Sequence, residues 1–395
     1  MKNKYELLAP AGSFPTLVTA VKAGADSIYF GLKEFSMRAN AKNFTIKDLN
    51  KINKICGKKV KKYLTLNVII YDNELKKLES IIKKIKGKVD AVICWDLSVI
   101  QLCKKYKIPF HISTQASISN SETVKFYKKL GAERIVLARE LNLKQIKEIK
   151  KKTKIELESF CHGAMCVAVS GRCFLSQHLF GRSANRGMCT QLCRRPYLIT
   201  DPEGKQLRVE SQTIMSAKDL CTLPFIEKLK QSGITSFKIE GRNRDPRYVE
   251  TVVKIYKKAL DKKLTKEEIE NSIKELNTVY TKGFSSGFYL GTPTSDDFSN
   301  VEHSSATHKK EFIGKIIHYY PKVNVGTIYV NTGKLEIGDD IVIIGKTTGM
   351  EKMKINKLEI NNKSVSSVKK GQEVGIKFPF RVRKNDEIYI VKKNK

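Results

Sequence analysis

The chain has 395 residues, of which 41% are hydrophobic, and a formal net charge of +34 from 74 basic and 40 acidic side chains. This length is enough for one large domain and a smaller one, and no segment approaches the ~18 apolar residues of a membrane-spanning helix. The N-terminal segment lacks the apolar stretch of a secretory signal peptide. We therefore expect a cytoplasmic protein that does not contact a membrane, in which the nine cysteines serve some purpose other than disulfides.

The basic charge has two components. Lysine is spread along the whole chain, as codon bias alone could produce, whereas nine of the fourteen arginines lie between residues 172 and 247. A basic surface attracts nucleic acid, and arginine grips phosphate and carboxylate groups through paired hydrogen bonds. The concentration of arginine therefore indicates an anionic substrate.

Along the first 245 residues a β-strand followed by an amphipathic helix recurs. Strands are expected at 5–11, 27–31, 63–70, 91–96, 110–115, 134–140, 155–163 and 236–241. Helices are expected at 14–23, 46–56, 73–86, 97–105, 120–130, 142–152 and 222–231. Three helices end in a glycine that leads into the next strand, in "AGADSIYFG", "LGAERIVLA" and "SGITSFKIE", which is typical of helix C-caps. Eight such units favour a TIM-like (β/α)₈ barrel, with an open doubly wound sheet as the alternative.

The domain prediction follows from these elements. The barrel occupies 1–245 and carries a long cysteine-rich insertion at 160–221, with its own hairpin signal "YLITDPEGKQLRVE". Residues 246–310 form a helical extension, with helices at 246–261 and 265–280 and then a linker. The second helix opens with a capping box from Thr265 to Glu268. Short strands and frequent turns in 311–395 predict a small antiparallel β-barrel.

Six cysteines lie close together in the sequence: Cys161, Cys166, Cys173, Cys189, Cys193 and Cys221. Structural zinc sites use C-x₂₋₄-C pairs, a spacing that Cys189 and Cys193 match but Cys166 and Cys173 do not. Irregular spacings are common in iron–sulfur proteins, so a cluster is favoured, while zinc and buried structural thiols stay open. Cys161 and His162 are adjacent and would point to opposite faces of a strand, which argues against a nucleophile with its base.

Polar residues at the C-terminal ends of barrel strands are candidate site residues, because barrel active sites form there. Glu158 and Glu240 are candidate acid–base residues, with a structural ion pair to arginine as the alternative for each. His162 is a candidate general acid or else a satisfied core histidine. Substrate binding is assigned to three further residues in these loops: Arg38, Gln115 and Arg242. Asn67 and Arg139 also stand at strand ends.

Seven blocks, in order, resemble the peptidase U32 family of collagenase-like proteins. "ESFCHGAMCVAVSGRCFLS" (158–176) resembles the family signature, and the other blocks are "LLAPAGSF", "YFGLKEFSMRANAKNF", "STQASISN", "RGMCTQLCRRPY", "SAKDLC" and "SFKIEGR". The resemblance covers nearly the whole chain. Despite the peptidase label, the resemblance implies oxygen-independent hydroxylation with a four-cysteine [4Fe–4S] cluster. Three substrates are then possible: a precursor in ubiquinone synthesis, the tRNA wobble uridine, which becomes 5-hydroxyuridine, or a cytidine of rRNA.

By position in the family blocks, the cluster ligands would be Cys166, Cys173, Cys189 and Cys221, with Cys193 as a competing ligand. The terminal domain and the basic surface favour an RNA substrate, and the chain length favours tRNA over rRNA. The expected partners are therefore tRNA, with rRNA as the alternative, a small anionic hydroxyl donor such as prephenate, and a second family member. A peptidase and a non-catalytic RNA-binding factor are the other hypotheses.

Overall fold

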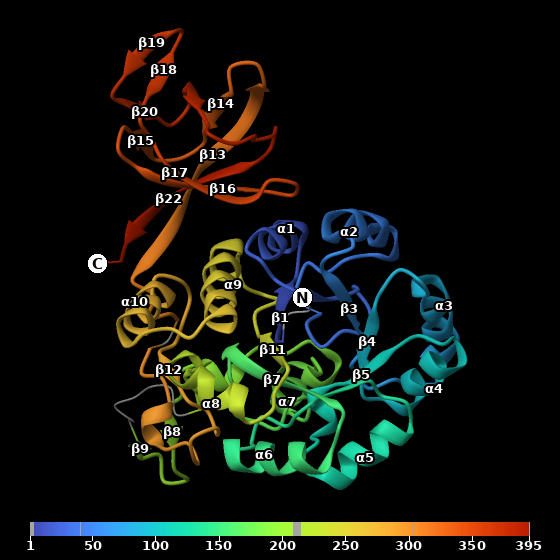
Figure 1. Cartoon of the computed structure of the whole chain (residues 1–395). Coiled ribbons are helices and arrows are strands. Elements are labelled where there is room, and N and C mark those ends of the chain that lie inside the picture. The colour runs from blue at the N-terminus through green and yellow to red at the C-terminus, as the bar shows by residue number, and fades with distance from the viewer. Residues whose placement is uncertain (1–3, 40, 208–214, 302, 395) are drawn as a thin grey trace.

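Eight parallel strands form a closed barrel at the centre of the protein (Figure 1). The computed structural model describes residues 4–39, 41–207, 215–301 and 303–394. Strand β11 pairs with both β7 and β1, which closes the ring and confirms the predicted barrel. The barrel strands are β1 (Glu6–Ala11), β2 (Ser27–Gly31), β3 (Lys61–Thr65), β4 (Ala91–Cys94), β5 (Phe110–Ile112), β6 (Arg134–Val136), β7 (Glu156–Gly163) and β11 (Ser236–Ile239).

Several strands end earlier than the sequence pattern predicts. The predicted strand 63–70, for example, ends at Thr65, yet Leu66 and Val68 beyond it are buried. Their apolar side chains belong to loops folded over the barrel mouth. The hydrophobic pattern therefore continues past the last ladder hydrogen bond, which moves the polar residues that follow into the mouth.

Helices surround the barrel as predicted: α1 (Phe14–Lys22), α2 (Leu49–Cys56), α3 (Leu75–Ile85), α4 (Leu97–Lys105), α5 (Ser121–Lys129), α6 (Leu143–Lys152) and α8 (Ile226–Gln231). The three helix-end glycines have φ angles of +96° (Gly24), +100° (Gly131) and +94° (Gly233). Only glycine adopts such angles without strain. The C-cap prediction made from these glycines is confirmed.

Two further helices, α9 (Pro246–Asp261) and α10 (Lys266–Leu276), follow the barrel. The predicted capping box is present, because Thr265 Oγ1 accepts from Glu268 N at 3.1 Å and the Glu268 carboxylate accepts from Thr265 N at 3.0 Å. The prediction that this helix reaches residue 280 is wrong: it is capped at Asn277, whose carbonyl accepts from the Thr307 amide. Within the described residues, no helix combines the length and apolar character needed to cross a membrane.

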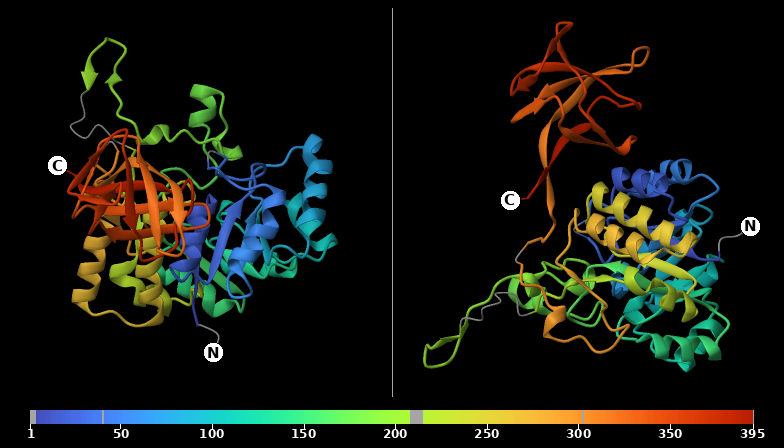
Figure 2. Two further views of the ribbon diagram at one scale, coloured as in Figure 1. Left: turned by 90° about the horizontal axis from the view of Figure 1, so that it is seen from above. Right: turned by 60° about the vertical axis from the view of Figure 1, so that its left-hand side comes forward.

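The C-terminal residues form a separate antiparallel domain with its own hydrophobic core, as predicted. Its main sheet contains β13 (His308–Tyr320), β14 (Val325–Val330), β16 (Asp340–Gly345), β17 (Gly349–Lys354), β18 (Leu358–Ile360), β19 (Lys363–Val365), β21 (Glu373–Lys377) and β22 (Glu387–Lys393). A second pair consists of β15 (Lys334–Glu336) and β20 (Ser367–Lys369). Figure 2 shows this domain standing on one side of the barrel.

The two domains touch along α1 and α9. A Cβ atom placed on Gly349, which has a φ of +74°, would lie 2.8 Å from Val18 Cγ1, so the β17 backbone lies directly on α1. Beside this contact, Lys352 Nζ is 2.7 Å from Glu250 Oε2 on α9. The absence of a side chain at residue 349 is therefore what allows this close approach.

The cysteine-rich insertion lies over the barrel mouth and contains α7 (Leu175–Phe180) and a short hairpin of β8 (Ile199–Thr200) and β9 (Gln206–Leu207). The hairpin projects away from the barrel in both views of Figure 2. It confirms the predicted turn, with Gly204 at a φ of +83°. Residues 208–210 of the predicted hairpin lie outside the described residues.

Candidate active site at the barrel mouth

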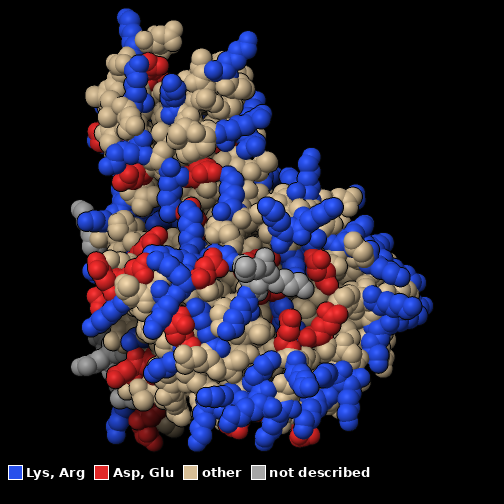
Figure 3. All heavy atoms as spheres, viewed as in Figure 1, with Lys and Arg blue, Asp and Glu red and all other residues tan. Residues whose placement is uncertain are grey.

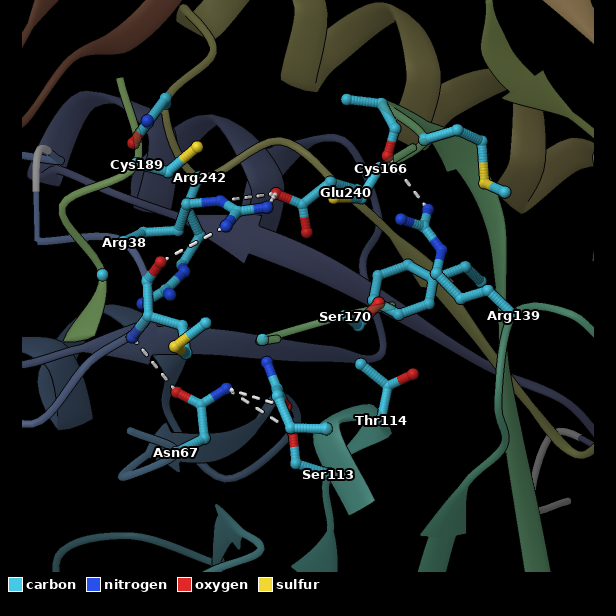
Figure 4. Close-up of a pocket in the computed structure, with 18 of the residues that line it drawn as sticks. Arg38, Asn67, Ser113, Thr114, Arg139, Cys166, Ser170, Cys189, Glu240 and Arg242 are labelled. Carbon is cyan, nitrogen blue, oxygen red and sulfur yellow. Dashed lines mark hydrogen bonds and ion pairs between the residues drawn. The ribbon is translucent and has the colours of Figure 1, made fainter. Parts of the chain in front are cut away.

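A polar cavity of about 150 Å³ lies at the C-terminal ends of the barrel strands (Figure 4). One wall consists of residues that follow the strands, and the other is the cysteine-rich insertion. A cavity of about this volume can hold a molecule the size of benzene, so there is room for one six-membered ring. Five basic residues and one acidic residue, Glu240, line it; the basic residues are Arg38, Arg139, Arg194, Lys238 and Arg242.

Glu240 is the centre of the charge arrangement. Its Oε1 accepts from Arg38 Nε at 3.1 Å and from Arg38 Nη2 at 3.0 Å, and its Oε2 lies 3.4 Å from the Tyr29 hydroxyl. Burial raises the pKa of Glu240, but the charges of Arg38, Arg242 and Arg139 outweigh it and lower the pKa to about 2. Glu240 is therefore a carboxylate at neutral pH, which accepts hydrogen bonds and has no proton to donate.

Arg242 and Arg139 bring two more buried guanidinium groups to the cavity. Arg242 Nη1 donates to Ser36 Oγ at 2.6 Å and to Thr65 Oγ1 at 3.1 Å, and burial lowers the pKa of Arg242 to about 10. Arg139 Nη2 donates to the Ala164 carbonyl at 3.0 Å. In the described structure, the buried Nε atoms of both arginines have no hydrogen-bond partner. Protein groups thus leave part of the donor capacity of this cavity unused.

A neutral polar wall lies on the opposite side of the cavity from the Arg38–Glu240 pair (Figure 4). The Gln115 side-chain oxygen accepts from Ser113 Oγ and lies 3.4 Å from Asn67 Nδ2. Asn67 Oδ1 in turn accepts from the Met37 amide at 3.3 Å. Amide and hydroxyl groups on this wall can orient a polar ring by hydrogen bonds, while the arginines attract negative charge.

Glu158 lies below the cavity and does not line it. The side chain is fully buried and is held by Arg134 Nη1 at 3.2 Å, Lys238 Nζ at 3.0 Å and Ser236 Oγ at 3.2 Å. This is the structural ion pair considered as the alternative for Glu158. Lys238 connects the two layers, because it also lines the cavity above.

His162 is also outside the cavity. Its Nδ1 lies 3.3 Å from the Tyr256 hydroxyl, and its ring packs against Tyr248 and Phe284. Burial, with a smaller effect from the charge of Arg244, lowers the pKa of His162 to about 3. The structure therefore brings together Glu240, Arg38, Arg242 and Gln115, but neither Glu158 nor His162.

The cysteines fall into two groups. Cys166, Cys189 and Cys193 line the cavity, and Cys173 is near enough for the four thiols to interact. Burial raises the pKa of Cys193 to about 11, the neighbouring Cys166 adds to the effect, and the charge of Arg194 opposes it. The described residues contain no set of three or more His, Cys, Asp or Glu side chains arranged to hold a metal ion.

Cys221 belongs to the second group. It lies at the end of β10 (Asp219–Cys221), which pairs antiparallel with β7, and its Sγ is 3.7 Å from the Tyr256 hydroxyl. Its electrostatic neighbour is Cys161, whose thiol is fully buried and lies 3.4 Å from the Lys238 carbonyl. Three of the four predicted ligands are thus electrostatic neighbours of Cys193, while Cys221 lies beside β7 next to Cys161 and Tyr256.

Local contacts fix the insertion over the mouth. The Asn185 side chain accepts from the Cys173 amide at 2.8 Å, and Arg186 Nη1 donates to Glu74 at 2.7 Å. A Cβ atom on Gly187 would lie 2.3 Å from the Ser36 carbonyl oxygen, so only glycine lets the insertion lie this close to the loop that carries Arg38. The position of the cysteines relative to Arg38 depends on this contact.

Two basic residues of the cavity were not predicted individually as site residues. Lys238 lies inside the strand "SFKIEG", and a charged residue in an otherwise apolar strand was the available signal. Arg194, whose Nη2 donates to the Met165 carbonyl at 3.0 Å, is one of the nine arginines between 172 and 247, and that concentration was the only signal for it.

Comparison with known proteins identifies the class. The family described as "Peptidase family U32" matches residues 12–299, and the chain belongs to this family. It is 41% identical over 406 residues to a protein named "Collagenase" from Porphyromonas gingivalis, which covers 98% of both chains. It is 36% identical over 358 residues to "tRNA hydroxylation protein P1" of Bacillus subtilis, covering 87% of this chain and 84% of the relative. A "23S rRNA 5-hydroxycytidine C2501 synthase" of Escherichia coli is 39% identical over 263 residues, which cover 66% of this chain and 40% of the relative.

Proposed function

We propose that this protein is an RNA-modifying enzyme that hydroxylates a pyrimidine, and that its substrate is the wobble uridine of tRNA, which becomes 5-hydroxyuridine. The observation that carries the proposal is the cavity, which is the size of one ring and combines a neutral polar wall with clustered arginines. A relative named for tRNA hydroxylation aligns over 87% of the chain. With such a substrate, we also propose that the protein works in the cytoplasm. The rRNA cytidine, which another relative's name specifies, is the second candidate.

The peptidase alternative finds little support in the cavity. None of its lining residues in the described structure is a histidine, so no serine or cysteine nucleophile there has a histidine base beside it. The sequence "GFSSG" (283–287) matches the nucleophile-elbow pattern, but it contains only the two-residue strand β12 (Phe284–Ser285) and leads into no helix. The name "Collagenase" of one relative makes a peptidase assay a necessary control.

The arginines support a second substrate, which we propose is a small anionic hydroxyl donor such as prephenate. Arg38, Arg139 and Arg242 would hold its carboxylate groups, and Gln115 with Asn67 would orient the uracil ring. In the overall exchange, the C5–H bond of uracil is replaced by C5–OH, while the donor loses its hydroxyl group and takes up the hydrogen. Atoms and electrons then balance without dioxygen. Glu240 would keep Arg38 in place and accept hydrogen bonds from bound substrate.

We further propose a [4Fe–4S] cluster held by Cys166, Cys173 and Cys189. The chemistry of the donor set supports the proposal, because thiolates are the usual cluster ligands and these three thiols are electrostatic neighbours of Cys193; the described side chains would have to move closer together around the cluster. Proximity supports Cys193 as the fourth ligand, whereas the family resemblance assigned Cys221. Arg38 interacts with Cys189, Arg139 with Cys166 and Arg194 with Cys193, so each of these cysteines has a cation nearby that would stabilise a thiolate ligand. A bound cluster would supply electron transfer.

The substrate is tested by nucleoside mass spectrometry of tRNA and rRNA from a deletion strain. The proposal expects 5-hydroxyuridine derivatives to disappear from tRNA and to return with the wild-type gene but not with Arg242→Gln. Unchanged tRNA with lost 5-hydroxycytidine in rRNA would select the other RNA substrate. Unchanged RNA together with cleavage of a collagen-like peptide would establish the peptidase instead.

The cluster is tested by anaerobic purification, followed by iron and sulfide analysis. About four of each per chain are expected, whereas stoichiometric zinc would refute the cluster. Cys193→Ser should lower the iron content, and Cys221→Ser should leave it unchanged; the reverse result would assign the fourth ligand to Cys221. The partnership with a second family member stays a prediction from the resemblance.

A further inference from the structure

Two open grooves adjoin the cavity. The first, of about 620 Å³, lies between the barrel mouth and the C-terminal domain, and Arg242 and Asn243 line both it and the cavity. The second, of about 550 Å³, lies between the cysteine-rich insertion and the segment after α10, and Gln191 and Arg194 line both it and the cavity. The cavity thus shares lining residues with a groove on each side.

A stacked pair joins the two grooves. The Arg244 guanidinium lies 3.4 Å from the centroid of the Tyr280 ring. Arg244 lines the first groove, and Tyr280 lines the second. The grooves and the stacked pair therefore form one continuous path past the mouth of the cavity, which we name the mouth track.

The mouth track is positively charged. The first groove contains Lys42, Arg242, Arg244, Lys310 and Lys346 against Asp245 and Glu387, and Asp245 is already 3.3 Å from Lys310. Among the described residues that line the second groove, Arg194, Arg195 and Lys282 are basic and none is acidic. Lysine and arginine are spread over most parts of the face seen in Figure 3, with acidic and uncharged residues between them, so charge alone does not mark a binding site. What distinguishes the track is its concave shape, its connection to the cavity and its arginine–tyrosine stack.

These features match single-stranded nucleic acid. Proteins bind such strands with basic grooves that follow the phosphates and with planar side chains on which bases stack. Enzymes that modify a base turn that nucleotide out of the strand and into a pocket. A pocket opening between two basic grooves allows the strand to enter on one side and leave on the other.

We infer that a single-stranded RNA segment lies along the mouth track, with the target nucleotide turned into the cavity. Its phosphates contact Lys42 and Lys346 in the first groove and Arg195 in the second, all of which are exposed. A neighbouring base stacks against the Arg244–Tyr280 pair. This inference rests on the proposed RNA substrate and adds the path of the strand, including a role for the C-terminal domain.

The test compares two triple variants with equal charge change. The track variant is Lys42→Gln, Lys346→Gln and Arg195→Gln. The control variant is Lys58→Gln, Lys59→Gln and Lys86→Gln, three exposed lysines in helix-to-strand loops at the opposite end of the barrel. Binding of a labelled tRNA anticodon stem–loop is measured as a function of salt, and circular dichroism with denaturation verifies that both variants fold.

Each phosphate contact to a single strand contributes about 0.7 to the slope of log K against log salt, which is about fivefold in affinity at about 0.1 M salt. The track variant should therefore bind about 100-fold more weakly and lower the slope by about 2, while the control stays near wild type. Equal weakening of both variants, or no RNA binding by the wild-type protein, would overturn the inference. Selective weakening in the track variant with unchanged nucleosides in the deletion strain would leave the path in place and refute the proposed reaction.

Discussion

Replacing Glu240 by glutamine tests how much this one carboxylate stabilises the folded protein by offsetting the charges of the arginines in the cavity. Glutamine keeps the size of the side chain and removes only its charge. Arg38 would then lose an ion pair with contacts of 3.0 and 3.1 Å, and Arg139 and Arg242 would lose their nearest negative charge. We expect a large loss of stability, because removing one member of a buried ion pair leaves the other charges uncompensated.

The size of the effect follows from the pKa. The surroundings lower the pKa of Glu240 from 4.5 to about 2, and each unit on that scale corresponds to about 1.4 kcal/mol. The ionised carboxylate therefore contributes about 3 kcal/mol to the free energy of unfolding, which agrees with the 3–5 kcal/mol typical of broken buried pairs. The Glu240 side chain is 12% exposed but that of Arg38 is 36% exposed, so solvent screening lowers this figure somewhat. Because the folded-state pKa is lowered, the contribution is complete above about pH 4.5 and disappears as the pH falls through about 2.

Urea denaturation at neutral pH measures the difference between wild type and Glu240→Gln. Glu148→Gln is the matched control, because Glu148 makes an exposed ion pair with Lys151 on the outside of α6 and its loss should change stability far less. A double-mutant cycle with Arg38→Gln should give a coupling energy of about 1.5–3 kcal/mol, as expected for a hydrogen bond between charged groups. If Glu240→Gln unfolds like Glu148→Gln, or if the cycle gives no coupling, the reasoning about this charge cluster is wrong.

Two further predictions concern the buried histidine and the domain contact. Since His162 is neutral in the folded protein, with a pKa near 3, unfolding takes up a proton below about pH 6.5 and stability should fall by about 1.4 kcal/mol per pH unit as the pH drops. Burial also lowers the pKa of His111, so two histidines contribute to this dependence of stability on pH. His162→Gln should therefore remove about half of the slope of stability against pH between about pH 6 and 5. An unchanged slope in urea denaturation would contradict the low pKa assigned to His162. Gly349→Ala should destabilise the protein by about 1–3 kcal/mol, because it adds a contact with Val18 to the strain of a positive φ. Gly371→Ala is the control, because Gly371 has a φ of +87° and no neighbour within 4 Å, so this variant adds backbone strain without a contact. Limited proteolysis should release the C-terminal domain only in the Gly349→Ala variant.

The barrel could be predicted because its signals are local. Each strand is a short apolar run, and the glycines at 24, 131 and 233 mark where a helix must end with a positive φ. Strand ends were less predictable, since Leu66 and Val68 are buried above the sheet as completely as the residues within it. Burial sets the hydrophobic pattern, and in this fold burial continues beyond the hydrogen-bonded ladder.

The site could be predicted in part. Glu158 and Glu240 are both acidic residues on barrel strands, and the sequence cannot distinguish a glutamate among Arg134 and Lys238 below the cavity from one that faces it. That difference depends on which layer of the barrel each residue reaches. The grouping of Cys193 with Cys166 and Cys189 depends on the path of the insertion, fixed by contacts such as Gly187 with Ser36 that link distant parts of the chain. Spacing along the chain carries no information about such contacts.

Three cysteine thiols lie on one wall of the cavity, so their oxidation in the cell would affect the cavity directly. Cys166, Cys189 and Cys193 border the same space as Arg38 and Glu240, so a thiol oxidised to a sulfenic or sulfinic acid would add bulk and negative charge inside the space that receives substrate. Oxidation of these thiols would then lower activity directly, without a separate protein that senses oxidative stress. Such oxidation would therefore change the shape and charge of the cavity itself.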